Sequence, residues 1–502
     1  MKKSSLRTPL STWLAWAFVV SAPFLVFGIL SLATGKNVVA TYPVWSDELD
    51  YWRNLFSFSH VGFQKGYSGM FEANPAIGTL SVHGLSPIFL YMPFVWVFGL
   101  TFSTIMLANA TWCSLGALLF CWLRKPKAIT AWLMGLFLLT YAPLLLYAPT
   151  SMTEMANYGL LLIYLTFLLG YLEKQTTGKL LATILAVCVL CLYRIPYFLL
   201  FFPIIWTFGK GRISWRMFGM ALLCGALTLG VYALSSFTTA PYAMGFLYHW
   251  VRADSFIGAI QMLLGHTKSN LISYFDYYLF GFDSMEGLFR LFYLCAMGLS
   301  LLATFLTIAK KDGKLRCCLR FSLSYCASFL LLLSSFAIVC VFYETTHWAD
   351  FRTLAPILWF TVASHLVCQR YALPALSALF SVLMLAILLV IPPVGFMDSE
   401  ERFTPPAPNE ALVEVAKSIP YNPEANNPFG NTVRLDTFDL SLQTALHAGL
   451  GLHYGFFTTD SCQKSEWILT KELNTVLLGY EKVVDLPEIQ LYKRQSPYEE
   501  MP

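Results

Sequence analysis

Residues 41–54 read TYPVWSDELDYWRN, and the interpretation of the whole chain starts from this stretch. It carries three carboxylates, Asp47, Glu48 and Asp50, although only 12% of the residues in the chain are charged. It follows directly on the first long apolar run, which extends from about residue 12 to residue 33. If that run crosses a bilayer, the acidic cluster lies at a membrane surface.

The composition is that of a membrane protein. The chain has 502 residues, of which 57% are hydrophobic, and its mean hydropathy is +0.60. Soluble proteins carry roughly 25% charged residues, and the apolar runs of this chain are long enough to cross a bilayer. The net charge of +4 is too small to indicate a nucleic-acid partner. Of the 12 cysteines only Cys462 lies in the polar tail, so the thiols are expected to be small packing residues.

The basic residues predict the topology. Those near the N-terminus precede the first apolar run, which indicates an uncleaved span with a cytoplasmic N-terminus. Residues 85–123 are almost continuously apolar, and the basic turn at 124–127 lies inside only if a single span, about 104–123, crosses there. Residues 86–102 are then expected to lie along the outer interface.

We therefore predict a membrane all-α fold in residues 1–395, with about eleven transmembrane helices. The predicted spans cover approximately residues 12–33, 104–123, 128–147, 156–172, 179–194, 196–208, 217–235, 287–309, 320–342, 353–369 and 373–392. The first outer loop is residues 35–103 with interfacial helices, and a second long outer segment, 236–286, is also expected to form interfacial helices.

Residues 396–502 are predicted to form a small extramembrane α/β domain. The patterns predict strands at NTVRLDTF (431–438), EWILT (466–470) and EIQLYKR (488–494), and a helix at LSLQTALHAGLG (440–451).

The first loop offers the most polar chemistry. Ser46 is expected to cap a helix whose first turn carries Asp47 and Glu48. On that helix Glu48 points away from the face of Asp47 and Asp50. Such a segment can be a solvated helix start anchored by tryptophans. The glycine-rich remainder of the loop, which carries the further candidates Glu72 and His83, favours a functional site.

Other ionisable residues stand where predicted spans begin or end. In YAPTSMTEMANYG (147–159), Glu154 is a functional candidate by its depth, or part of a helix cap that begins at Ser151. Arg194 lies between two apolar runs, where it can pair with a carboxylate or phosphate or extend toward lipid headgroups. His347 and Arg352 lie in YETTHWADFRTLAP (343–356), a solvated turn or a phosphate site.

Taken in order, these features resemble the GT-C glycosyltransferases, which use polyprenyl-phosphate-linked sugars. The Asp-Glu pair opens the first outer loop, and HGLSPIFLYMPFVWVFG (83–99) resembles the segment that closes it in protein mannosyltransferases and aminoarabinose transferases. APTSMTEMANYGLLLIYL (148–165) resembles their second acidic site, where aspartate is common and this chain has Glu154. FRTLAPILWF (351–360) resembles their late Arg-x-x-x-Pro helix start, and residues 45–69 are similar to uncharacterised bacterial polysaccharide-pathway members.

The resemblance implies an inverting transfer of a sugar from a polyprenyl-phosphate donor to an acceptor on the periplasmic side, such as a lipopolysaccharide O-antigen, another glycan or a protein. It implies Asp47 as general base with Glu48 second, and Arg352 and Arg194 as phosphate ligands. The remaining candidates for the donor, acceptor or metal site are Glu154, His83, Asp50, Glu72 and His347. The resemblance leaves open whether a divalent metal ion takes part. It implies a bacterial inner-membrane enzyme with no nucleic-acid partner.

Two other classes of polytopic protein remain alternatives. A lipid-linked glycan polymerase or ligase is expected to have a late outer loop rich in arginine and histidine. A transporter of lipids or oligosaccharides is expected to have matched halves with charges near the bilayer midplane, whereas the charges of this chain gather at the ends of the predicted spans.

Overall fold

The structure is a computed structural model. It describes residues 9–41, 43, 45–61, 67–68, 76–77, 83–210, 213–239, 253, 255–276, 285–309, 323–342, 349–368, 370–390, 415, 419, 433–435, 466–470, 479–486 and 489–495.

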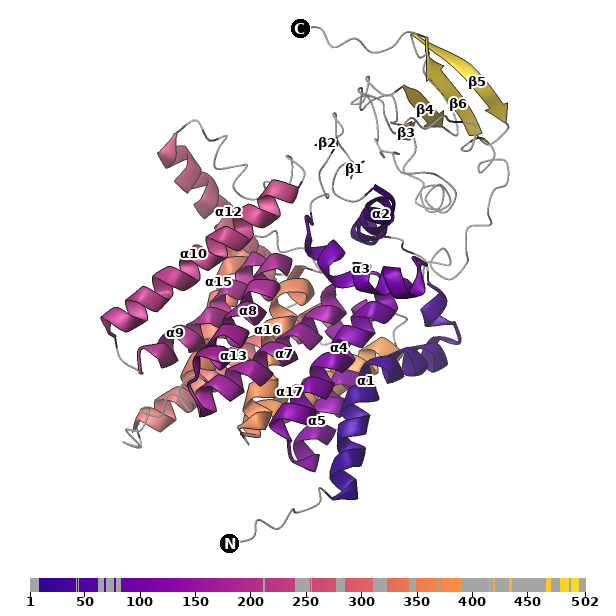
Figure 1. Ribbon diagram of the computed structural model, residues 1–502. Coiled ribbons are helices and arrows are strands. Elements are labelled where there is room, and N and C mark those ends of the chain that lie inside the picture. Colours follow the sequence, from indigo (N-terminus) through magenta and orange to yellow (C-terminus); the bar gives the residue numbers. More distant parts are fainter. Residues whose placement is uncertain are drawn as a thin grey trace.

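Long apolar helices form a bundle, and two further helices and a small sheet lie at one end of it (Figure 1). Each predicted span contains helix in its described part. The bundle helices are α1 (Leu10–Thr34), α4 (Thr104–Arg124), α5 (Ala128–Thr140), α6 (Ala142–Tyr147), α7 (Glu154–Glu173), α8 (Thr177–Tyr193), η2 (Ile195–Phe201), α9 (Phe202–Phe208), α10 (Trp215–Thr238), α13 (Met285–Ala309), α15 (Tyr325–Phe342), α16 (Ala349–Val367) and α17 (Ala372–Val390).

Six of the described helices are long and apolar enough to cross a membrane without interruption: α1, α4, α7, α10, most of α13, and α15. Some of the other predicted spans are shorter or broken. For example, residues 128–147 divide into α5 and α6 around Tyr141. Large apolar side chains such as Leu14, Trp122 and Leu222 are more than half exposed on the outside of the bundle. An apolar exterior of this kind is suited to lipid rather than to water.

Two contacts between α1 and α4 test the topology of the first loop. Near the start of α1, Trp16 Nε1 donates to the carbonyl of Pro126, just beyond the end of α4, at 3.1 Å. Just beyond the other end of α1, Ser103 Oγ donates to the carbonyl of Val39 at 2.7 Å. The two helices are therefore antiparallel, and the intervening residues start and finish at the same end of the bundle. The prediction of a single span between residues 85 and 123 is confirmed.

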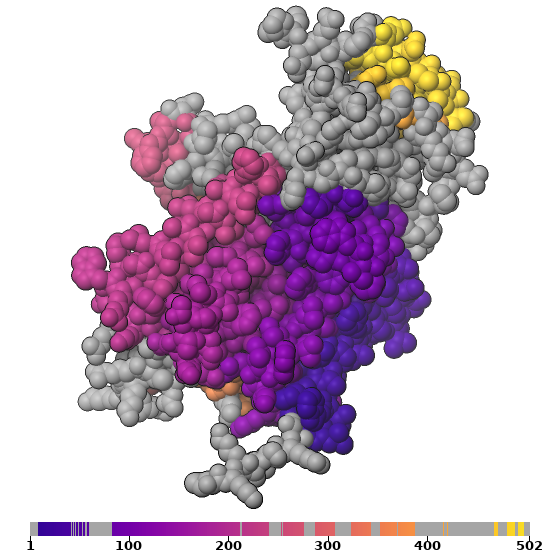
Figure 2. Space-filling view, in the orientation of Figure 1, coloured from indigo at the N-terminus to yellow at the C-terminus, as the bar shows by residue number. Residues whose placement is uncertain are grey.

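The first loop supplies α2 (Ser46–Val61) and α3 (Ser86–Phe98), which lie across that end of the bundle (Figure 1). The structure thus places residues 86–98 as the sequence predicted. The described part of the loop also contains η1 (Val38–Ala40) and a short antiparallel pair, β1 (Tyr67–Ser68) and β2 (Ala76–Ile77). Helices from the first half of the chain, coloured indigo to magenta, pack into a continuous surface on one face (Figure 2).

Helices α4 and α7 approach each other closely. A Cβ atom on Gly116 would collide with the backbone of Gly159, and one on Gly159 would collide with the backbone of Trp112. Small residues let two helices pack backbone to backbone, which is a common way to associate helices in lipid. This crossing fixes the first turns of α7, which carry Glu154.

The tail forms a four-stranded sheet in the order β3-β4-β6-β5. Its strands are β3 (Val433–Leu435), β4 (Trp467–Thr470), β5 (Tyr480–Leu486) and β6 (Ile489–Arg494). The β3 and β4 strands are parallel and the other pairs are antiparallel. The three predicted strands are confirmed, β5 was not predicted, and the predicted helix at 440–451 lies outside the described residues. In the segment 236–286, α12 (Phe256–Asp276) confirms one of the expected helices.

Candidate active site

The first turn of α2 presents two adjacent carboxylates in different directions. Glu48 is buried, and its Oε2 accepts a hydrogen bond from the backbone N–H of Trp45 at 3.1 Å. Its Oε1 accepts another from the backbone N–H of Ser151, in the loop before α7, at 2.7 Å. Ser46 is the first residue of α2, whereas the sequence predicted it at the capping position just before the helix. The sequence predicted that Asp47 and Glu48 diverge, but not that Glu48 joins two loops.

Asp47 faces the bundle and pairs with a distant arginine. Its Oδ2 lies 2.7 Å from Nη1 of Arg352 at the start of α16. Its Oδ1 lies 3.7 Å from Nε2 of His83. Burial acts to raise the pKa of Asp47, but the neighbouring His83 and Arg352 outweigh it and hold the pKa well below its usual value. Asp47 is therefore an ionised carboxylate over the physiological pH range.

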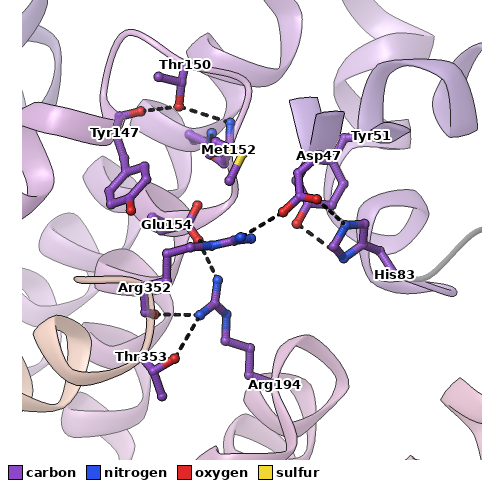
Figure 3. A network of polar contacts seen from close by, with 11 residues as sticks. Asp47, Tyr51, His83, Tyr147, Thr150, Met152, Glu154, Arg194, Arg352 and Thr353 are labelled. Atoms are coloured by element: carbon purple, nitrogen blue, oxygen red, sulfur yellow. Dashed lines mark hydrogen bonds and ion pairs between the residues drawn. The ribbon is translucent and has the colours of Figure 1, made fainter. Parts of the chain in front are cut away.

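Glu154 is fully buried at the first residue of α7 and accepts from two arginines (Figure 3). Arg352 Nε donates to its Oε1 at 2.7 Å, and Arg194 Nη2 donates to the same oxygen. The residue before the helix is Thr153, so the alternative of a cap beginning at Ser151 is wrong. Arg352 thus bridges two carboxylates, one on α2 and one on α7.

Arg194 lies between α8 and η2 and holds the start of α16 as well as Glu154. Its Nη1 donates to the backbone carbonyl of Arg352 at 2.7 Å and lies 3.4 Å from Oγ1 of Thr353 (Figure 3). Of the partners that the sequence offered for Arg194, a carboxylate is the one observed. The planar guanidinium suits this arrangement because it directs several N–H groups in one plane.

His83 stands beside the ion pairs, just before α3. Its Nε2 is 3.7 Å from Asp47 and 3.9 Å from Oδ2 of the buried Asp50. The hydroxyl of Tyr51 lies 3.4 Å from its Nδ1, and the two rings pack with centroids 4.3 Å apart. Burial first, and then the charge of Asp47, raise the pKa of Tyr51 well above its usual value, so Tyr51 keeps its proton.

The structure therefore brings together residues from five parts of the chain. Asp47, Asp50, His83, Glu154, Arg194 and Arg352 form one polar cluster where α2 and α3 cover the end of the bundle. Glu72 and His347 lie outside the described residues. The sequence placed Tyr51 on the helix face of Asp47 but assigned no role to Tyr51 or Thr353. Within the described ranges, no three His, Cys, Asp or Glu side chains are grouped to hold a metal ion.

Comparison with known proteins supports the fold. No protein-family model and no curated protein sequence matches the chain. Among solved structures, the crystal structure of ArnT from Cupriavidus metallidurans bound to undecaprenyl phosphate is similar, with a TM-score of 0.53 and 14% sequence identity. The match covers 96% of this chain and 98% of the ArnT chain. The chain therefore shares the fold of this ArnT structure over almost its whole length.

Proposed function

We propose that this protein is an inverting glycosyltransferase that moves a sugar from a polyprenyl-phosphate donor to an acceptor hydroxyl. The observation that carries the proposal is the pairing of Asp47 with Arg352, whose backbone Arg194 holds, in a fold like that of ArnT. The ArnT structure holds undecaprenyl phosphate, and a lipid of that class is the donor carrier proposed for this chain.

The reaction needs a cationic site for the leaving group. A sugar phosphate leaves with the electron pair of the broken bond between the anomeric carbon and the phosphate oxygen, so negative charge grows on the phosphate in the transition state. Guanidinium groups suit a phosphate because they present several N–H donors in one plane. Arg352 takes this role, and Arg194 supports it through Glu154 and the carbonyl of Arg352.

The reaction also needs a base for the acceptor. The acceptor oxygen forms a bond to the anomeric carbon from the face opposite the phosphate, and its proton passes to Asp47. While Asp47 is paired with Arg352 and His83 it is a weak base, because these neighbours hold its pKa low. A donor phosphate that draws the N–H groups of Arg352 away from Asp47 raises the pKa of Asp47 and makes it a stronger base when the substrate is present.

Glu48 has a positioning role in this scheme. Both of its oxygens accept backbone N–H groups, one from Trp45 before α2 and one from Ser151 before α7. It therefore holds the helix of Asp47 against the loop that precedes Glu154. His83 orients the other side of Asp47.

The proposal extends to the cellular setting. The polar cluster and the domain at 396–502 lie on the periplasmic side of a bacterial inner membrane, with the N-terminus in the cytoplasm. Supporting it, basic residues precede α1 and Arg124 ends α4 near the start of α1. The proposed acceptor is a cell-surface glycan such as lipopolysaccharide O-antigen.

The test is a transfer assay in membranes supplied with labelled polyprenyl-phosphate sugars and bacterial surface glycan. We expect Asp47→Asn to lower the rate by about 10²- to 10⁴-fold, the range for loss of a general base, while the protein inserts normally. Asp485→Asn, the same chemical change at a carboxylate whose side chain is 62% exposed on the tail sheet, is the control and keeps full activity. Full activity in Asp47→Asn would overturn the assignment of the base.

A further inference from the structure

The first turns of α7 carry polar atoms that have no partner in the described part of the protein. They are Oε2 of Glu154, both Oδ1 and Nδ2 of Asn157, and the hydroxyl of Tyr158. Glu154, Asn157 and Tyr158 are each fully buried. Buried polar groups of folded proteins nearly always have hydrogen-bond partners, and exceptions often mark functional sites.

Asn157 lies close to the proposed phosphate site. It is three residues after Glu154, so the two side chains are neighbours on the helix surface, about 4.5 Å apart along the axis. Tyr164, two turns further along the same face as Asn157, donates to the carbonyl of Leu200 in η2 at 2.6 Å. Asn157 therefore lies on the helix face that meets η2, the segment directly after Arg194.

The close approach of α4 and α7 holds Asn157 in place. Gly159 packs against the backbone of Trp112 with no room for a side chain, so the backbone two residues from Asn157 is tightly constrained. A nearby buried asparagine shows the contrast. Asn109 on α4 accepts from the hydroxyl of Tyr91 at 2.7 Å and donates to the carbonyl of Met152 at 2.6 Å.

The unpartnered atoms favour one kind of ligand. Oε2 of Glu154 and Oδ1 of Asn157 require hydrogen-bond donors, whereas Nδ2 of Asn157 requires an acceptor. A phosphate diester offers acceptors only, so it cannot satisfy the two oxygens. A sugar hydroxyl both donates and accepts. A sugar whose phosphate is held by Arg352 would lie within reach of atoms one helical turn away.

We infer that Asn157 and the free Oε2 of Glu154 form a buried subsite that binds hydroxyl groups of the donor's sugar. The inference rests on the proposed function, because the sugar reaches this place only as part of a lipid phosphate bound at the arginines. It assigns Asn157 to donor recognition and gives Glu154 two tasks: Oε1 orients the arginines, and Oε2 accepts from the sugar.

The test uses purified full-length protein and compares the binding of undecaprenyl phosphate with that of undecaprenyl phosphate carrying glucose, galactose or mannose. We expect the wild-type protein to bind at least one glycosylated lipid more tightly than the bare lipid. We expect Asn157→Leu to lose about tenfold or more of that preference, the factor for one buried hydrogen bond, while its affinity for the bare lipid stays unchanged. Thr166→Val is the matched control. It removes a buried hydroxyl of the same helix that bonds only to its own backbone, at Leu162, and it keeps the preference.

Thermal unfolding of the empty protein separates recognition from structure. Leucine has nearly the same shape as asparagine and no polar atoms, so Asn157→Leu leaves the melting temperature unchanged or raises it if the amide is unpartnered. A large fall in melting temperature would show that the amide has a structural partner and would overturn the inference. The inference is also overturned if Asn157→Leu keeps the preference for the glycosylated lipid, which is the result expected if the unpartnered atoms bind only water. It is overturned as well if the wild-type protein prefers no glycosylated lipid. Failure to bind the bare lipid would instead refute the proposed function.

Discussion

Arg194 donates a hydrogen bond to the backbone carbonyl of Arg352, 2.7 Å away and 158 residues later in the chain. This bond joins the end of α8 to the first turn of α16, and both arginines also reach the same oxygen of Glu154. The proposed phosphate ligand Arg352 is thus held through its backbone as well as its side chain. The planar shape of the Arg194 guanidinium, in addition to its charge, lets it donate to Glu154 and to the start of α16 at the same time.

We therefore expect Arg194→Lys to impair the protein although the charge is kept. An ammonium is a compact point charge and cannot replace a planar fork that reaches Glu154 and the start of α16 together. The affinity for undecaprenyl phosphate should fall about tenfold, the effect of losing roughly one buried hydrogen bond. Titration of the purified protein with the lipid measures this. Unchanged affinity would mean that the charge alone is sufficient.

The pH dependence of stability should reveal the low pKa of Asp47. Because the pKa is lowered in the folded state, the ionised carboxylate stabilises the protein fully above the unfolded value of about 3.9. That contribution is lost only as the pH falls further, toward the folded pKa. The difference in the free energy of unfolding between the wild type and Asp47→Asn should thus not shrink from about pH 8 to pH 5, and it should become smaller below about pH 4. Unfolding measured across this pH range tests the sign, and a difference that already shrinks between pH 7 and pH 5 would contradict it.

Glu48→Gln should destabilise the protein without removing the base. Both Glu48 oxygens accept backbone N–H groups, and a glutamine must turn its NH₂ group toward one of them. One buried N–H then lacks an acceptor, so the free energy of unfolding should fall by about 1–3 kcal/mol, and transfer should be reduced less than in Asp47→Asn.

Glu173→Gln is the control for this change. Glu173 forms an ion pair with Arg124, but its side chain is 52% exposed. A surface pair contributes little, about 0–1 kcal/mol. Chemical or thermal unfolding of both variants compares them directly. An equal loss in the free energy of unfolding would argue against a stabilising role for the hydrogen bonds that join α2 to the loop before α7.

Gly159→Ala should disrupt the crossing of α4 and α7. The added methyl group would collide with backbone atoms of Trp112 and Cys113, which cannot move aside as a side chain can. Overpacking of this kind costs about 1–3 kcal/mol or more, and the displacement of α7 should also weaken donor binding through Glu154.

Gly170→Ala, on the same helix, is the matched control. Its added Cβ would make only ordinary contacts, the nearest at 3.6 Å to Arg124. Alanine is also a better helix former than glycine by up to about 1 kcal/mol. We expect its melting temperature to be unchanged or higher than that of the wild type, and loss of stability in both variants would mean that close packing at Gly159 is not the cause.

The sequence by itself determined the membrane class, the positions of the helices and the single span between residues 85 and 123. These follow from local properties: the length of apolar runs is set by bilayer thickness, and basic turns such as 124–127 indicate the inner side. The ordered motifs of the sequence also indicated Asp47, Arg194 and Arg352 as candidates, and the depth of Glu154 in the membrane indicated that residue.

Only the tertiary structure decided how these residues pair. Arg352 reaches Asp47 and Glu154, which are hundreds of residues away in the chain, and nothing in local spacing determines such a contact. Likewise, the division of roles between Asp47, which faces arginine, and Glu48, which faces backbone N–H groups, depends on where α16 and the loop before α7 lie around α2. The unpartnered amide of Asn157 could not be recognised from sequence at all, since whether a buried polar group is satisfied depends on the atoms that packing brings around it.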